Sequence, residues 1–189
     1  MTDMLVEAVW AAFILIAISE LGDKTQLATI SLAAQYRKPW TVFLAATLAL
    51  TAASVIGVAA SSLLAQVIPF ALISKIAGIL FIAFGILSLF DKMAWQGRNM
   101  EAKAFWGTLS MIFISELGDK TQLAVIALAA KVQAPLEIML GVIAAFLVLN
   151  GVGLVVGEKL ARVIPMKWVK RGAGILFIII GALTLLNLI

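Results

Sequence analysis

The chain of 189 residues is 63% hydrophobic and only 13% charged, with a mean hydropathy of +1.13, which excludes an ordinary water-soluble domain. It contains no cysteine and no histidine, which disfavours soft-metal sites, thiol catalysis and redox centres. The net charge of +4 does not indicate nucleic-acid binding, because the basic residues lie between apolar segments rather than in a continuous stripe.

Six apolar segments follow one another along the chain, and each is of the length needed to cross a hydrocarbon core about 30 Å thick as a helix of roughly 20 residues. The connections between them are short, so we expect the function to lie among the helices. The sequence therefore predicts an all-α integral membrane protein with six transmembrane helices. The six predicted helices cover residues 5–34, 40–64, 70–90, 105–130, 136–156 and 166–188.

An internal duplication divides the chain into two halves. A shift of 96 positions aligns residues 18–34 with residues 114–130, with identity at 15 of 17 places. We interpret the chain as two three-helix repeats, 1–92 and 104–189, joined by a linker, 93–103. Because three is an odd number, the second repeat must enter the membrane from the opposite face. This arrangement is the inverted repeat on which many secondary transporters are built.

The lysines and arginines of the predicted loops predict the orientation in the membrane. One side of the membrane collects ten of them and the other side two, while the remaining two lysines lie inside the duplicated segment. Since basic loops are retained in the cytoplasm, we expect the linker to be cytoplasmic and both termini to lie outside. The first seven residues carry no Lys or Arg, so we expect neither a secretory signal nor a transit peptide, and the expected location is a prokaryotic inner membrane.

The duplicated segment contains a polar motif near the middle of the first and fourth predicted helices. Residues 19–26 read Ser-Glu-Leu-Gly-Asp-Lys-Thr-Gln, and residues 115–122 repeat them without change. A carboxylate at bilayer depth costs at least about 2.5 kcal/mol, so such groups usually mark an ion or proton path. At about 100° per residue, the serine, both acids and the glutamine of each motif fall on one face of a helix.

Two such faces would supply carboxylate, hydroxyl and amide oxygens, which are the ligands of hard divalent cations such as Mn²⁺ and Ca²⁺. The motif lysines offset part of the negative charge, and the motif glycines could let each helix unwind and expose carbonyl groups. No cofactor is expected apart from the transported cation. The predicted ligands are Glu20, Asp23, Thr25, Gln26, Glu116, Asp119, Thr121 and Gln122, with Lys24 and Lys120 for charge balance, Gly22 and Gly118 as hinges, and Ser19, Ser115, Ser54 and Asn150 as weaker candidates.

A purely structural interpretation competes with this one. Glu20 with Lys24, and Glu116 with Lys120, stand four residues apart and could form intrahelical ion pairs that only allow the helix to insert. That interpretation leaves the two aspartates of the motifs without a role. The motif glycines could equally serve close helix packing, and the weaker polar candidates could be ordinary hydrogen-bonding residues between helices.

The duplicated Glu-x-Gly-Asp-Lys-Thr motif in a small six-helix chain resembles the second calcium/cation antiporter family, which includes Golgi and chloroplast manganese/calcium transporters and bacterial manganese exporters. The resemblance covers essentially the whole chain. It implies a secondary transporter that exchanges Mn²⁺ or Ca²⁺, most simply for protons. It also implies that both motifs, Glu20 to Thr25 and Glu116 to Thr121, form the cation site.

The residues by themselves indicate an inverted-repeat transporter of a hard cation, whereas manganese and the direction of export rest on the resemblance. A calcium/proton antiporter is the alternative within the same class. From other classes, an intramembrane hydrolase with paired carboxylates and a scaffold subunit also stay open. The sequence leaves open the stoichiometry of exchange and whether the chain forms a homo-oligomer. The partners expected are the lipid bilayer, the cation and protons.

Overall fold

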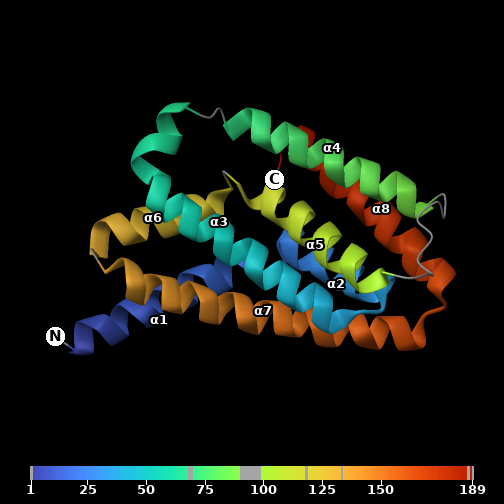
Figure 1. Cartoon of the computed structure of the whole chain (residues 1–189), viewed down its shortest axis with the longest axis horizontal. Coiled ribbons are helices and arrows are strands. Elements are labelled where there is room, and N and C mark those ends of the chain that lie inside the picture. Colours follow the sequence, from blue (N-terminus) through green and yellow to red (C-terminus); the bar gives the residue numbers. More distant parts are fainter. Residues whose placement is uncertain are drawn as a thin grey trace.

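The computed structural model describes residues 2–67, 70–89, 99–117, 119–132, 134–186 and 188, and all regular structure among these residues is α-helical (Figure 1). This confirms the all-α class. The described chain forms eight helices rather than six, because the first and fourth predicted segments are each broken in two. The helices are α1 (Thr2–Glu20), α2 (Lys24–Tyr36), α3 (Pro39–Val67), α4 (Phe70–Leu89), α5 (Met100–Glu116), α6 (Lys120–Val132), α7 (Pro135–Val163) and α8 (Met166–Leu185).

The helices of the second half repeat those of the first. α2 and α6 both have 13 residues, α3 and α7 both have 29, and α4 and α8 both have 20. Each member of the second half begins and ends 96 positions after its counterpart in these three pairs. The sequence duplication is therefore a duplication of structure as well. α5 begins at Met100, so the last four residues of the predicted linker are helical.

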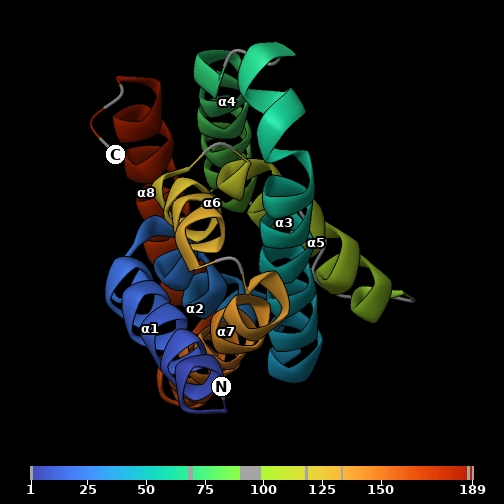
Figure 2. The ribbon, with the colours of Figure 1, turned by 90° about the vertical axis from the view of Figure 1, so that its left-hand side faces the viewer.

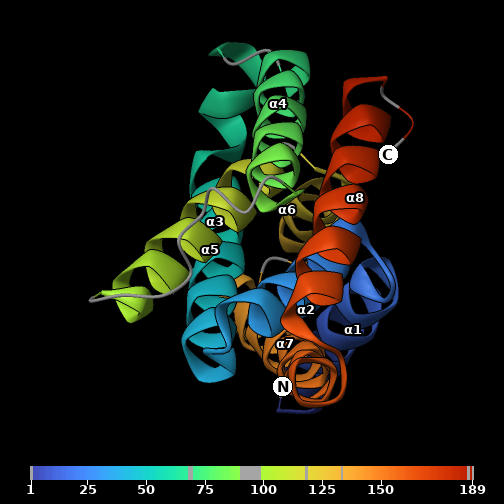
Figure 3. The ribbon, with the colours of Figure 1, turned by 90° about the vertical axis from the view of Figure 1, so that its right-hand side faces the viewer.

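Three helices of the described chain are long and apolar enough to cross a membrane, with spans at Pro39–Ala59, Pro135–Val163 and Lys167–Leu185. A shorter apolar helix covers Gly78–Leu89. The short helices α2 and α6 are each about 20 Å long at 1.5 Å per residue, which is less than the thickness of the hydrocarbon core. Figures 2 and 3 show α2 and α6 near the middle of the bundle, with longer helices around them.

Close glycine contacts hold α4 and α8 side by side. Gly78 lies against Gly181, and Gly85 lies against Gly174, so the two helices run antiparallel. Gly174 is the repeat counterpart of Gly78, and Gly181 is the counterpart of Gly85. The shift of 96 positions therefore turns one contact into the other, which is the signature of a local two-fold axis.

The same axis passes between two equivalent phenylalanines. Phe81 and Phe177 occupy the same position in the two repeats, both are buried, and their ring centroids are 6.0 Å apart. Elsewhere the halves interleave, since α1 packs on α7 and its counterpart α5 packs on α3. Each repeat thus buries its apolar surface mainly against the other repeat rather than against itself.

Candidate metal centre

Both motifs interrupt their helices at the same place. α1 ends at Glu20 and α2 begins at Lys24, and between them Gly22 adopts a φ of 76°, a left-handed conformation that glycine tolerates best. The amide of Asp23 donates to the Glu20 carbonyl at 3.1 Å. In the second copy, α5 ends at Glu116, α6 begins at Lys120, and the Asp119 amide donates to the Glu116 carbonyl at 3.2 Å.

The expected unwinding therefore occurs, and the predicted continuous face of one helix is wrong. Glu20 belongs to α1, Asp23 to the interruption and Gln26 to α2, so the regular 100° step does not connect them. The physical reason is the left-handed Gly22, which redirects the chain before α2 starts. Gly118, the second predicted hinge, lies outside the described residues.

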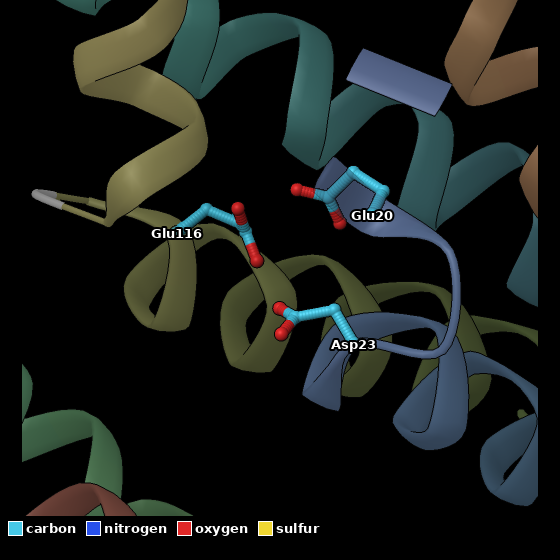
Figure 4. A group of neighbouring side chains, drawn as sticks. All are labelled: Glu20, Asp23 and Glu116. Atoms are coloured by element: carbon cyan, nitrogen blue, oxygen red, sulfur yellow. The ribbon is translucent and has the colours of Figure 1, made fainter. Parts of the chain in front are cut away.

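Three carboxylates converge at the interruptions. Glu20, Asp23 and Glu116 each offer an oxygen, and these oxygens all lie within 4.8 Å of one another (Figure 4). Glu20 and Glu116 are 3% and 2% exposed, so water does little to screen their mutual repulsion. Asp23 occupies the N-cap position of α2 but makes no capping hydrogen bond with its side chain, and the carboxylate turns toward the two glutamates instead. Such a group of oxygens suits a hard cation.

C-termini and N-termini of helices meet at the two interruptions. Glu20 and Glu116 are the last residues of α1 and α5, where the carbonyl ends of a helix carry a partial negative charge. A carboxylate at that end is unfavourable alone, and a bound cation would offset both contributions. The N-termini of α2 and α6 begin at Lys24 and Lys120 and carry the opposite partial charge, so the helix ends oppose each other and the carboxylates carry the attraction for a cation.

The fourth motif acid, Asp119, is engaged by a lysine of the other repeat. Lys24 Nζ lies 2.7 Å from Asp119 Oδ2, and the two side chains are only 7% and 13% exposed. Lys24 thus forms an ion pair between the repeats, not the intrahelical pair with Glu20 on which the purely structural interpretation depends. The side chain of Lys120, the counterpart of Lys24, lies outside the described residues.

The predicted threonine and glutamine ligands differ in their hydrogen-bond partners. The Thr25 hydroxyl donates to Glu116, whereas the Thr121 hydroxyl is buried and has no hydrogen-bond partner in the described part of the chain. The Gln26 side chain accepts a hydrogen bond from the Gly22 amide at 2.7 Å. Gln122 donates to the Ala53 carbonyl on α3, also at 2.7 Å. Each glutamine thus contacts a backbone group, Gln26 within its own motif and Gln122 on α3.

Three of the four weaker candidates donate hydrogen bonds to groups other than the carboxylates. The hydroxyls of Ser19 and Ser115 donate to carbonyls of their own helices, and Asn150 donates to Thr47 at 3.1 Å, which joins α7 to α3. Ser54 is buried on α3. The Ala53 carbonyl, which accepts from Gln122, was not predicted from the sequence. The sequence feature that could have indicated this contact is Gly57, a small residue one turn further along α3. The repeat aligns Gly57 with Gly153.

Comparison with known proteins agrees with the motif. Over 92% of its length the chain is 30% identical to the PAM71-homolog, chloroplastic, of Arabidopsis thaliana and 32% identical to GDT1-like protein 2, chloroplastic, of Oryza sativa. It spans 58% and 59% of the lengths of these two plant proteins. Over 89% of its length it is 26% identical to a Vibrio cholerae protein named "Putative manganese exporter", of which it spans 86%. No solved structure matches the chain.

The family comparison covers both repeats. The model described as divalent cation/proton antiporter GDT1 matches residues 8–96 and 104–189. The two matched regions contain both interruptions, all three converging carboxylates and the ion pair between the repeats. The chain therefore belongs to the GDT1 family of divalent cation/proton antiporters.

Proposed function

We propose that this protein exchanges a divalent cation for protons across a membrane, with the cation bound by Glu20, Asp23 and Glu116. The observation that carries the proposal is the convergence of three carboxylate oxygens within 4.8 Å of one another, two of them on almost fully buried side chains. Buried like charges at this spacing repel strongly unless a cation or protons neutralise them. The family is one of transporters rather than enzymes, which favours transport over the hydrolase interpretation.

Manganese is the cation that we propose, and export is the direction. All-oxygen ligands suit Mn²⁺, and the name of the Vibrio cholerae relative describes manganese export. A calcium/proton antiporter would use the same oxygens in a larger and more flexible site, and it is the alternative that the experiment below must separate.

Proton coupling would result if the carboxylates become protonated when the cation leaves. An emptied group of three carboxylates, two of them almost fully buried, would take up protons, and an incoming divalent cation would displace them, because metal ligands must be deprotonated. Metal and protons then compete for the same oxygens. An inward proton gradient would in this way drive the metal outward.

We also propose that the two halves form an inverted repeat in a prokaryotic inner membrane, with both termini outside. The support is the antiparallel pairing of α4 and α8 about a local two-fold axis. A two-fold axis that relates antiparallel helices is perpendicular to them, so it lies in the membrane plane if the helices cross the bilayer. The ten-to-two distribution of basic residues supports the orientation.

Purified protein in sealed proteoliposomes tests the function. We expect metal uptake to be accompanied by proton movement in the opposite direction, and a scan over Mn²⁺, Ca²⁺, Mg²⁺ and Zn²⁺ identifies the cation. Glu20→Gln and Glu116→Gln should each abolish exchange, whereas Glu7→Gln, an exposed acid of α1 outside the group, should not. Transport by both amide variants with unchanged metal affinity would contradict the shared site. Absence of any metal movement by the wild type would contradict transport and favour a scaffold.

A further inference from the structure

A cavity that contains two arginines lies at the far end of α2 from the carboxylates. It has a volume of about 390 Å³ and is enclosed by the end of α2, the start of α3 and the last turns of α7. In Figure 1 this end of the bundle lies opposite the N-terminus, where α2 and α7 end and α8 begins. The residues that line the cavity are Ala33, Arg37, Pro39, Glu158, Ala161 and Arg162.

Arg37 ends α2 in a conformation that glycine adopts more readily. Its φ is 52° and its ψ is 30°, which is the left-handed region. The side chain donates one long hydrogen bond, of 3.4 Å, to the Ala161 carbonyl, and it has no carboxylate partner in the part of the chain that the structure describes. A guanidinium group has five N–H donors, so most of them are free for a ligand. Neither the backbone conformation nor a protein partner explains an arginine at this position.

Arg162 lines the same cavity from α7. Its side chain pairs with Glu158 one turn earlier, and the two side chains are 76% and 36% exposed. An ion pair this accessible to solvent is weak, so an incoming anion can compete with Glu158 for the guanidinium. Arginines from two helices that meet in one cavity suit a phosphate group, because paired N–H donors match phosphate oxygens.

The other repeat provides an internal comparison for this charge. The basic residues Arg37, Lys159, Arg162, Lys167 and Lys170 correspond, at a shift of 96 positions, to Gln133, Leu63, Gln66, Ala71 and Ser74. The basic character therefore belongs to this end of the molecule and not to the duplicated unit. Retention of basic loops in the cytoplasm requires positive charge on one side, but it does not require two arginines to line one cavity.

The position of the cavity favours a membrane lipid as the source of the phosphate. With 29 residues, α7 is roughly 40 Å long, which exceeds a hydrocarbon core of about 30 Å, so its last turns reach the level of the lipid headgroups. Trp168, near the start of α8, is 60% exposed, as is typical of tryptophan at the membrane interface.

A second cavity at the same helix ends suits an acyl chain. It has a volume of about 200 Å³, lies between α2, α7 and α8, and is mostly apolar. Its lining residues are Ser31, Ala34, Leu160, Ile164, Trp168, Val169, Gly172 and Ala173. The two cavities are lined by adjacent residues, Ala33 and Ala34 on α2 and Leu160 and Ala161 on α7.

We propose that this end of the protein binds an anionic phospholipid, with the phosphate headgroup between Arg37 and Arg162 and an acyl chain in the apolar cavity beside α8. Basic pockets between transmembrane helices are known to bind such headgroups. The bound lipid connects α2 of the first repeat with α7 of the second. The inference goes beyond the proposed transport function and does not depend on it, because neither cavity contains a residue of the carboxylate group.

Lipid titration of the delipidated full-length protein in a nonionic detergent tests the proposal. Phosphatidylglycerol and phosphatidylcholine are added separately, and bound lipid is counted by native mass spectrometry. We expect phosphatidylglycerol to bind about tenfold more tightly. Arg37→Gln and Arg162→Gln, which introduce the residue type of the counterpart positions, should each lower that affinity about tenfold and leave phosphatidylcholine unaffected. Lys103→Gln is the matched control, since Lys103 is an exposed lysine of α5 that lines neither cavity.

Three further variants separate binding from folding and from general charge. Arg37→Gly keeps the left-handed backbone and removes the guanidinium, so it should unfold at no lower a temperature than the wild type in lipid-free detergent and still bind phosphatidylglycerol less tightly. Arg37→Lys keeps the charge without the paired donors and should give an intermediate affinity. Glu158→Gln should raise the affinity, because it removes a negative charge from the cavity and releases Arg162.

Several outcomes would overturn the proposal. Equal affinities for the two lipids, or an unchanged affinity for phosphatidylglycerol in both arginine-to-glutamine variants, would exclude the site. An equal loss in Lys103→Gln would show a general effect of positive charge. Inorganic phosphate at the same concentration should not displace the lipid, and displacement would identify a site for a soluble anion instead.

Discussion

Gly174 on α8 lies so close to Gly85 on α4 that a Cβ added at Gly174 would stand 2.9 Å from the Gly85 carbonyl oxygen and 2.8 Å from Cγ of Leu89. Gly172 lies two positions earlier on the same helix, and a Cβ added there would meet no atom within 4 Å. The two glycines therefore provide a matched pair for testing the contact between the repeats.

We expect Gly174→Ala to lower the free energy of unfolding by about 1–3 kcal/mol, because a backbone oxygen cannot move aside as a flexible side chain does. Gly172→Ala should be neutral or slightly stabilising, since alanine favours the helix. Thermal unfolding of both variants in detergent measures the difference. Equal stability of the two variants would contradict the close approach of α4 and α8.

The left-handed Gly22 gives a second prediction. An added Cβ at Gly22 meets no atom within 4 Å, so Gly22→Ala introduces no clash but places alanine at a φ of 76°, at a cost of about 1–2 kcal/mol. The strain disfavours the interruption that places Glu20 and Asp23 beside Glu116, so metal binding should weaken. Gly22→Asn should retain more affinity, because asparagine tolerates this conformation better.

Gly151→Ala is the control for this prediction, because Gly151 lies within α7 and an added Cβ there also meets no atom within 4 Å. Isothermal titration of the purified variants with Mn²⁺ compares their affinities. An affinity of Gly22→Ala equal to that of Gly151→Ala would show that the interruption does not position the carboxylates.

Much of this architecture is readable from the sequence. The shift of 96 positions identifies the repeat, and the glycine inside a long apolar segment indicates the place of the interruption. The acids that converge are three of the four predicted from their position at bilayer depth. These features are predictable because they depend on composition and local propensity.

The partners of the motif side chains are not predictable in the same way. The spacing of four residues favours an ion pair between Glu20 and Lys24, but the interruption removes the helical geometry on which that expectation depends. Lys24 pairs with Asp119 of the other repeat instead. The motif sequence does not indicate which lysine of one repeat pairs with which acid of the other, so the pair between Lys24 and Asp119 is visible only in three dimensions.

An exposed ion pair between the predicted membrane segments gives a prediction of pH dependence. Lys38 lies 2.7 Å from Glu101, and this hydrogen bond together with the lysine charge lowers the pKa of Glu101 below its usual value of 4.5. Because the folded pKa is the lower one, the pair stabilises the protein above pH 4.5, and the stabilisation is lost as the pH falls through the folded pKa.

Lys38→Met should therefore be less stable than the wild type at neutral pH, by a small amount because both groups are exposed, and the difference should shrink below pH 4.5. Lys159→Met, which removes an exposed lysine of α7, is the control. Thermal unfolding in detergent across this pH range measures both. A difference that grows in acid would show that the pair does not act through the Glu101 charge.

The membrane orientation can be tested directly, since the chain contains no cysteine. A cysteine at Gly97 in the central linker, a position outside the described residues, should be protected from an impermeant thiol reagent in intact cells and react after the membrane is opened. Cysteines near both termini should react in intact cells. The reverse labelling pattern would place the linker outside and the termini in the cytoplasm.

Competition between metal and protons is the last prediction, and it depends on the three converging carboxylates. Protons and a divalent cation need the same oxygens, so the apparent affinity for Mn²⁺ should fall as the pH is lowered. The binding of Mn²⁺ at constant pH should release protons, and buffers of different ionisation enthalpy reveal that release in calorimetry. Glu116→Gln removes one of the competing groups and should release fewer protons, whereas Glu7→Gln should behave as the wild type.

In sealed vesicles an imposed proton gradient should accelerate metal movement in the opposite direction. Metal transport that is indifferent to pH and to collapse of the gradient would contradict antiport and favour a uniporter or a channel.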